Sequence, residues 1–141
     1  MDSPELGMEM LTVSEPTAAD ELATRVNAVN EKRQEMERHI LYEIEGILHE
    51  TGQAARSRVL FLAGEHWHPG VLGIVASKLV DRYHRPAFVM TCRDGAMKGS
   101  ARSVPGFNIH GALCRLEHLF DRFGGHAQAA GFTLKAQNID R

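Results

Sequence analysis

The residues best suited to hold an anion lie in one short segment, residues 123–131, which reads Phe-Gly-Gly-His-Ala-Gln-Ala-Ala-Gly. Gly124 and Gly125 carry no Cβ, so their backbone is free to turn its N–H groups toward a ligand. His126 follows at once, and the small residues after it favour a helix. A Gly-Gly turn that runs into a helix N-terminus is typical of a phosphate site. A tight turn with an incidental histidine stays open as a second interpretation, because short glycine-rich matches are unspecific.

A second set of polar groups lies in residues 98–103, Lys-Gly-Ser-Ala-Arg-Ser. If these residues form a strand, Lys98, Ser100 and Arg102 share one face, because side chains alternate along a strand. Arg102 can hold a phosphate through two parallel hydrogen bonds, and Lys98, Ser100 and Ser103 can each donate one. The glycine before Ser100 permits close approach of a ligand. The alternative interpretation is a hairpin with one solvated face.

Residues 65–70 place two histidines on either side of a tryptophan. His66 and His68 resemble a metal-binding pair, but a zinc site needs further ligands, and the other histidines show no ligand spacing. We therefore predict no metal site within the chain. Trp67 between them favours a plug in the core over a platform on which a base stacks.

The sequence contains no complete catalytic machinery. The serines of residues 98–103 lack the Gly-x-Ser-x-Gly elbow, and neither cysteine is arranged with a histidine for nucleophilic attack. The two cysteines show no CxxC spacing, no apolar run approaches about 18 residues, and the first residues do not begin a signal peptide. These features predict a cytoplasmic protein with reduced thiols and no membrane association.

The net charge of −2 is unevenly distributed. Residues 1–50 hold 12 acidic and 4 basic side chains, whereas residues 51–141 hold 6 acidic and 12 basic ones. With 43% hydrophobic and 24% charged residues, the chain has the composition of a folded domain. A basic globular part behind an acidic arm is compatible with a polyanionic ligand.

Hydrophobic spacing predicts a long helix followed by an α/β domain. Between residues 17 and 50, apolar side chains recur at steps of three, four or seven, and a helix of this size is about 45 Å long. Such a helix is typical of a connector or a coiled-coil arm, and we favour a connector that packs only partly on the α/β domain. The fold class predicted is α/β, a mixed β-sheet flanked by helices and preceded by the connector helix. The elements expected after the connector are a strand at 58–64, a helix at 71–83, a hairpin of 87–91 with 96–104, a helix at 108–123, a strand at 132–134 and a helix starting at 138–141.

Three blocks, residues 66–76, 98–103 and 124–131, resemble in order and spacing the DHH-associated domain of RecJ-type single-strand-specific exonucleases. Residues 17–50 look like the connector helix that joins this domain to the catalytic DHH domain, and residues 2–11 look like the last helix of that domain. The division expected is therefore a catalytic-domain remnant at 1–15, the connector at 16–52, and a nucleic-acid-binding domain, truncated at its C-terminal end, at 53–141.

The resemblance implies that the parent protein hydrolyses single-stranded DNA from the 5′ end in repair and recombination. Its Mn²⁺ or Mg²⁺ would be bound by the DHH domain, whose Asp-His-His element is absent here, so the fragment alone is expected to be inactive. The partners implied are single-stranded DNA and the DHH domain of the same polypeptide.

By the same resemblance, Arg102 and His126 would contact phosphate near the scissile bond, and His126 would assist the metal site of the missing domain. Gly124 and Gly125 would supply backbone donors, and the two histidines of residues 66–68 would line the same cleft. The full predicted substrate-binding set is Lys98, Ser100, Arg102, Ser103, Gly124, Gly125, His126, His66 and His68.

Two other functions stay open. One is a related phosphodiesterase that acts on oligonucleotides or cyclic dinucleotides. The other is a non-enzymatic binding or dimerisation module, in which residues 17–50 would form a coiled-coil arm.

Overall fold

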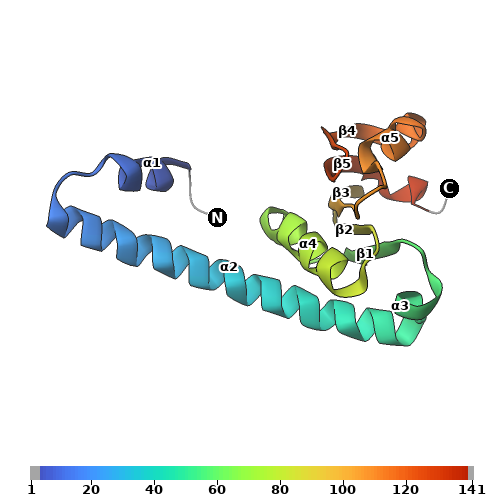
Figure 1. The fold of residues 1–141 in the computed structure, drawn as a ribbon, viewed down its shortest axis with the longest axis horizontal. Helices are drawn as coiled ribbons and strands as arrows, with labels where there is room; N and C mark the ends of the chain where they lie inside the picture. The colour runs from blue at the N-terminus through green and yellow to red at the C-terminus, as the bar shows by residue number, and fades with distance from the viewer. Residues whose placement is uncertain (1–3, 140–141) are drawn as a thin grey trace.

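The computed structural model describes residues 4–139, and its longest element is the helix α2, Pro16–Thr51 (Figure 1). The helix ends at Gly52, which has a left-handed φ of 66° and donates its N–H to the Leu48 carbonyl. A shorter helix, α1 (Pro4–Thr12), folds back along the N-terminal half of α2 (Figure 1). The long helix predicted for this part of the chain is therefore confirmed.

The C-terminal half of α2 packs on the α/β domain. Ile40, Ile44 and Leu48 are buried in one hydrophobic core with residues of the sheet and of helix α4, Leu72–Tyr83. The N-terminal half packs against α1 instead, and Leu22 is its buried residue there. Within residues 4–139, no helix combines the length and the apolar character that crossing a membrane requires.

The sheet has five strands in the order β1-β2-β3-β5-β4. The first pair, β1 with β2, is parallel, and the other pairs are antiparallel, so the sheet is mixed as predicted. The strands are β1 Leu60–Gly64, β2 Ala87–Arg93, β3 Ala96–Arg102, β4 Phe120–His126 and β5 Ala129–Lys135. The remaining helical elements are α3 Gln53–Arg56, η1 Pro69–Val71, α5 Ile109–Cys114, η2 Glu117–Leu119 and η3 Ala136–Asn138.

Helices cover the two sheet faces unequally. On one face α4 packs over β2 and β3, and the C-terminal part of α2 packs against α4. On the other face α5 packs against β4 and β5 (Figure 1). A core cluster lies under each layer: Leu60, Leu62, Trp67 and Val89 belong to the first, and Phe88, Met97, Ile109 and Phe132 to the second. On the α4 face, β5 and β4 remain largely open to solvent.

The helix predicted for residues 108–123 is wrong beyond its first turns. Asn108 does cap it, accepting from the Gly111 N–H at 2.9 Å, but α5 ends at Cys114 and the chain continues as η2 and β4. A register shift in β4 lies between Phe120 and Arg122. The extra residue turns Phe120 to the same side as the phenylalanine three positions later, so a bulged strand imitates helical spacing.

The Gly-Gly turn leading into a helix is also wrong. Gly124 and Gly125 lie inside β4, and residues 127–128 form a two-residue turn into β5. Pairing with β5 overrides the local helix preference of the alanine-rich segment, because tertiary context outweighs propensity. At the far end the structure has the single turn η3 where a helix was expected, and Asp140 and Arg141 of that prediction lie outside the described residues.

Candidate nucleic-acid interface

The sheet register brings most of the predicted binding residues onto one open face. Directly paired residues of neighbouring strands project to the same side of a sheet, so β3, β5 and β4 build rows of three side chains. Successive rows are two residues apart along each strand, which is about 6.8 Å. The three rows, read from β3 through β5 to β4, are Arg102–Ala129–His126, Ser100–Gly131–Gly124 and Lys98–Thr133–Arg122.

Two glycines form the floor of a groove on this face. Gly124 and Gly131 are paired across β4 and β5, and the groove around them has a volume of about 520 Å³. A Cβ on Gly124 would have no atom within 4 Å, and one on Gly131 would meet only the Gly99 carbonyl at 4.0 Å. Neither glycine is thus required by packing. The space that they leave suits the close approach of a ligand.

Two other glycines, in contrast, are required by packing. A Cβ on Gly99, which faces the opposite side, would collide with the Phe132 ring. Gly125 has a φ of 151°, and a Cβ there would approach the Ala130 Cα to 2.6 Å. At Gly73 a Cβ would lie 2.8 Å from a guanidinium nitrogen of the β3 arginine, which is the end of a flexible side chain that can move aside. The open pair on the groove floor is therefore distinct from Gly99 and Gly125.

Arg102 lies where β3 meets the beginning of α4. Its Nη1 donates to the Ala101 carbonyl at 3.0 Å, and its Nη2 occupies the space left by Gly73 in the first turn of the helix. The N-terminus of a helix carries partial positive charge. An anion in this corner would therefore meet a guanidinium group and a helix N-terminus together.

His126 is exposed at the end of β4, and the adjoining turn is anchored by backbone hydrogen bonds. The Ser103 N–H donates to the Gln128 carbonyl at 2.9 Å, and the Ile109 N–H donates to the Ala127 carbonyl at 3.0 Å. These bonds tie the tip of the β4–β5 hairpin to the loop that precedes α5. The position of His126 at the rim is consequently defined by the fold.

Three of the predicted site residues lie outside the strands, and thus outside the three rows of strand residues. Ser103 is buried, and its hydroxyl donates to the Phe107 carbonyl at 2.7 Å. His68 accepts from the Gly70 N–H at 3.1 Å and caps η1, while His66 is exposed in the same loop. Any role of these three residues in binding stays a prediction.

Trp67 is the buried core plug that the sequence favours. Its side chain is 2% exposed, and its Nε1 donates to the Glu43 carboxylate at 2.6 Å. Glu43 also pairs with His39 one turn earlier on α2. The loop between β1 and η1 is thereby attached to the connector helix.

Groove residues that sequence reasoning missed are Arg122, Gly131 and Thr133. The sequence pattern places Arg122 in the predicted helix at 108–123 and Gly131 at the end of the segment 123–131. Their shared face follows from the pairing of β4 with β5, for which a single sequence carries no direct signal. The alternation of Phe132 and Leu134 is the one local pattern that indicated a strand there.

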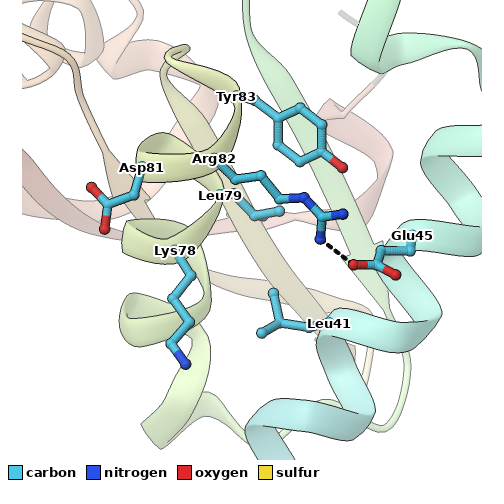
Figure 2. A pocket seen from close by; sticks show the side chains of 7 residues that line it. All are labelled: Leu41, Glu45, Lys78, Leu79, Asp81, Arg82 and Tyr83. Carbon is cyan, nitrogen blue, oxygen red and sulfur yellow. Dashed lines mark hydrogen bonds and ion pairs between the residues drawn. The ribbon is translucent and has the colours of Figure 1, made fainter.

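The basic residues beside the long helix have acidic partners, unlike those of the groove within residues 4–139. Between α2 and α4 lies a cavity of about 390 Å³, across which Arg82 reaches Glu45 (Figure 2). The hydrogen bond that Arg82 donates to the Glu45 carboxylate raises the pKa of Arg82 above its ordinary value. Nearby, the buried carboxylate of Glu37 pairs with Arg33 at 3.1 Å and with Lys78. The basic groups at this junction are thus neutralised by carboxylates.

On the groove face, by contrast, the basic side chains of residues 98, 102 and 122 make no ion pair with any residue of the described part of the chain. Unpaired cations around a cleft concentrate positive potential there. Among residues 4–139, no group of three or more His, Cys, Asp or Glu side chains could hold a metal ion. The chemistry available at the groove is therefore anion binding by charge and by hydrogen-bond donors.

The chain is similar to a known domain family and to proteins named as exonucleases. Residues 56–141 match the family model of the DHHA1 domain. The single-stranded-DNA-specific exonuclease RecJ of Bacillus subtilis is 40% identical over 134 residues, which is 94% of this chain and 17% of that protein. RecJ of Dickeya dadantii is 39% identical over 150 residues, 99% of this chain and 26% of that protein. The crystal structure of RecJ from Thermus thermophilus in complex with Mn²⁺ superposes with a TM-score of 0.83 at 29% identity, over 96% of this chain and 20% of that one.

Proposed function

Because this chain belongs to the DHHA1 domain family, we propose that its glycine-floored groove binds the sugar–phosphate backbone of single-stranded DNA. The chain spans between 17% and 26% of the length of the two RecJ proteins described above, and those proteins are named as single-stranded-DNA-specific exonucleases. We infer that it is the substrate-binding part of a RecJ-like 5′–3′ exonuclease acting in DNA repair and recombination. Residues 53–141 would form the binding domain, and residues 16–52 would connect it to a catalytic DHH domain.

The observation that carries this proposal is the open glycine pair surrounded by unpaired cations. Gly124 and Gly131 leave room for a backbone to lie against the sheet, and the basic rim supplies charge. Phosphate contacts of this kind position a strand without reading its sequence. The groove is therefore suited to an enzyme that must move along any single strand.

Each polar side chain has a distinct part in this proposal. Arg102 would hold one phosphate through paired N–H groups, close to the first turn of α4. Lys98 and Arg122 would hold the phosphate two rows further on. The hydroxyls of Ser100 in the second row and Thr133 in the third row would donate further hydrogen bonds to the backbone. His126, at the end of the groove near Arg102, would contact the phosphate next to the scissile bond.

The divalent metal belongs to a different part of the parent enzyme in this proposal. The described residues offer no set of ligands for Mn²⁺ or Mg²⁺, so we assign no chemical step to a metal on this chain. Two of the structures that resemble it are RecJ in complex with Mg²⁺ and with Mn²⁺. Binding and orienting the strand is the task that remains for the residues present.

Fluorescence anisotropy with a labelled oligothymidine tests this function. We expect binding that weakens with salt and tolerates changes of sequence, because each phosphate contact releases counterions. Neutralising Lys98, Arg102 or Arg122 to Gln should each lower the salt slope by about 0.7, the value for one contact on a single strand. Lys32→Gln, an exposed substitution on the connector helix, is the matched control and should leave the slope unchanged. An affinity that does not change with salt concentration would contradict the assignment. So would a decrease of the salt slope in Lys32→Gln as large as that in the groove variants.

A further inference from the structure

The cationic face continues beyond the groove along the direction of the strands. Arg93 is paired with Ala96, and Ala96 is paired with Lys135, so these residues form a fourth row on the same face as Lys98. We propose that Arg93 and Lys135 hold the nucleotides that flank the groove, so that the bound strand runs lengthwise over β5. The proposal rests on the function proposed above and adds a direction and a length to it.

The shape of the sheet favours this lengthwise path. Along the open face of β5 the side chains are small in three successive rows, those of Ala129, Gly131 and Thr133, before Lys135. Donors from β3 line one side of this trough and donors from β4 line the other. A strand crossing the sheet at right angles would instead meet α4, which packs over β2 and β3. The lengthwise trough is thus the unobstructed route.

The spacing of the rows also suits a polyanion. Four rows span about 20 Å at 3.4 Å per residue, and each step of about 6.8 Å is comparable with the separation of successive phosphates in an extended single strand. Cations occur in the first, third and fourth rows, and the glycine pair occupies the second. The face therefore presents positive charge at intervals that a backbone of several nucleotides can follow.

The fourth row is held in place and is free of acidic partners. The Ala136 N–H donates to the Gly95 carbonyl at 3.0 Å, which joins the end of β5 to the turn between β2 and β3. Arg93 and Lys135 are exposed, and in the part of the chain that the structure describes neither makes an ion pair, including with the neighbouring Asp94. Both side chains are available to a ligand.

Binding of oligothymidines of graded length to the 141-residue chain tests the proposal. The probes are a dinucleotide, a tetranucleotide and an octanucleotide, and the variant is Arg93→Gln with Lys135→Gln. We expect its affinity for the dinucleotide to equal that of the wild type, while its salt slope for the octanucleotide falls by about 1.4, two contacts of about 0.7 each. Arg93→Lys with Lys135→Arg should keep the wild-type slope, and Arg115→Gln, exposed at the end of α5, is the off-site control.

The possible outcomes distinguish a failure of the proposed function from a failure of the lengthwise path. If the wild-type chain binds no oligothymidine in a salt-dependent manner, the proposed function itself fails. If the wild-type chain binds, but the neutralised variant has the same affinity and salt slope at every oligothymidine length, the lengthwise path is refuted while the proposed function stands. If the neutralised variant lost the same affinity for the dinucleotide as for the octanucleotide, the lengthwise path would likewise be refuted. Thermal unfolding of both double variants confirms that each is folded at the assay temperature.

Discussion

Substituting Gly131 by valine should affect the free energy of unfolding and the affinity for single-stranded DNA in different ways. Gly131 lies inside β5 with ordinary backbone angles, and its Cβ would meet nothing closer than 4.0 Å. Glycine in a strand is about 0.5–1 kcal/mol less favourable than alanine, and valine is a strand-favouring residue. The free energy of unfolding should therefore stay the same or rise by up to about 1 kcal/mol.

Binding should change in the opposite direction. The valine side chain would stand in the second row between Ser100 and Gly124, where it would lift a phosphate away from its donors. Loss of one hydrogen bond to a charged group costs about 1.5–3 kcal/mol, which corresponds to a roughly 10- to 150-fold larger dissociation constant. Alanine at the same position should give a smaller loss in the same direction.

Urea unfolding and anisotropy with oligothymidine measure the two effects on the same samples. Gly99→Ala is the matched control on the opposite face of the sheet, because its Cβ would approach the Met90 Cβ to 2.9 Å and overlap the Phe132 ring. Overpacking of this kind should destabilise the fold by about 1–3 kcal/mol, and the added methyl group points away from the groove floor. Wild-type DNA affinity in a folded Gly131→Val protein would refute the role given to the glycine floor. So would a loss of stability as large as that of the control.

Two further predictions concern the junction between the connector and the domain. Glu37→Gln should lower the free energy of unfolding by about 2–3 kcal/mol, because it leaves Arg33 and Lys78 without their buried carboxylate; an unchanged urea midpoint would contradict this. Trp67→Phe should cost about 1–3 kcal/mol, since the Glu43 carboxylate loses the indole donor, and the loss should shrink in a Glu43→Gln background if that bond is responsible.

Local patterns predicted the elements that depend on near neighbours. The apolar stripe indicated the long helix, which is present as α2. The predicted hairpin of 87–91 with 96–104 is present as β2 and β3, and Asp94 and Gly95 in its turn both have positive φ, as such a turn requires. Strand alternation likewise placed Lys98, Ser100 and Arg102 on one face, as the register confirms.

Local patterns failed where the structure depends on distant pairing. Phe120 and Phe123 suggested a helix because a bulge at Asp121 gives a strand the spacing of a helix turn. The anion turn at Gly124 was inferred from two adjacent glycines, whereas the sheet gives them different tasks. Gly125 allows the hairpin strands to approach, and Gly124 opens the groove floor.

The sequence alone indicated which residue types could bind a polyanion and where the long helix α2 lies, because both follow from composition and short-range spacing. Only the tertiary structure decided that Arg122, Gly131 and Thr133 stand beside Arg102, Ser100 and Lys98. It also decided that the basic groups near α2 are paired with carboxylates, whereas those over β5 have no such partner among residues 4–139. Both outcomes depend on which strand pairs with which and on which helix covers which face, and these are contacts between residues far apart in the chain.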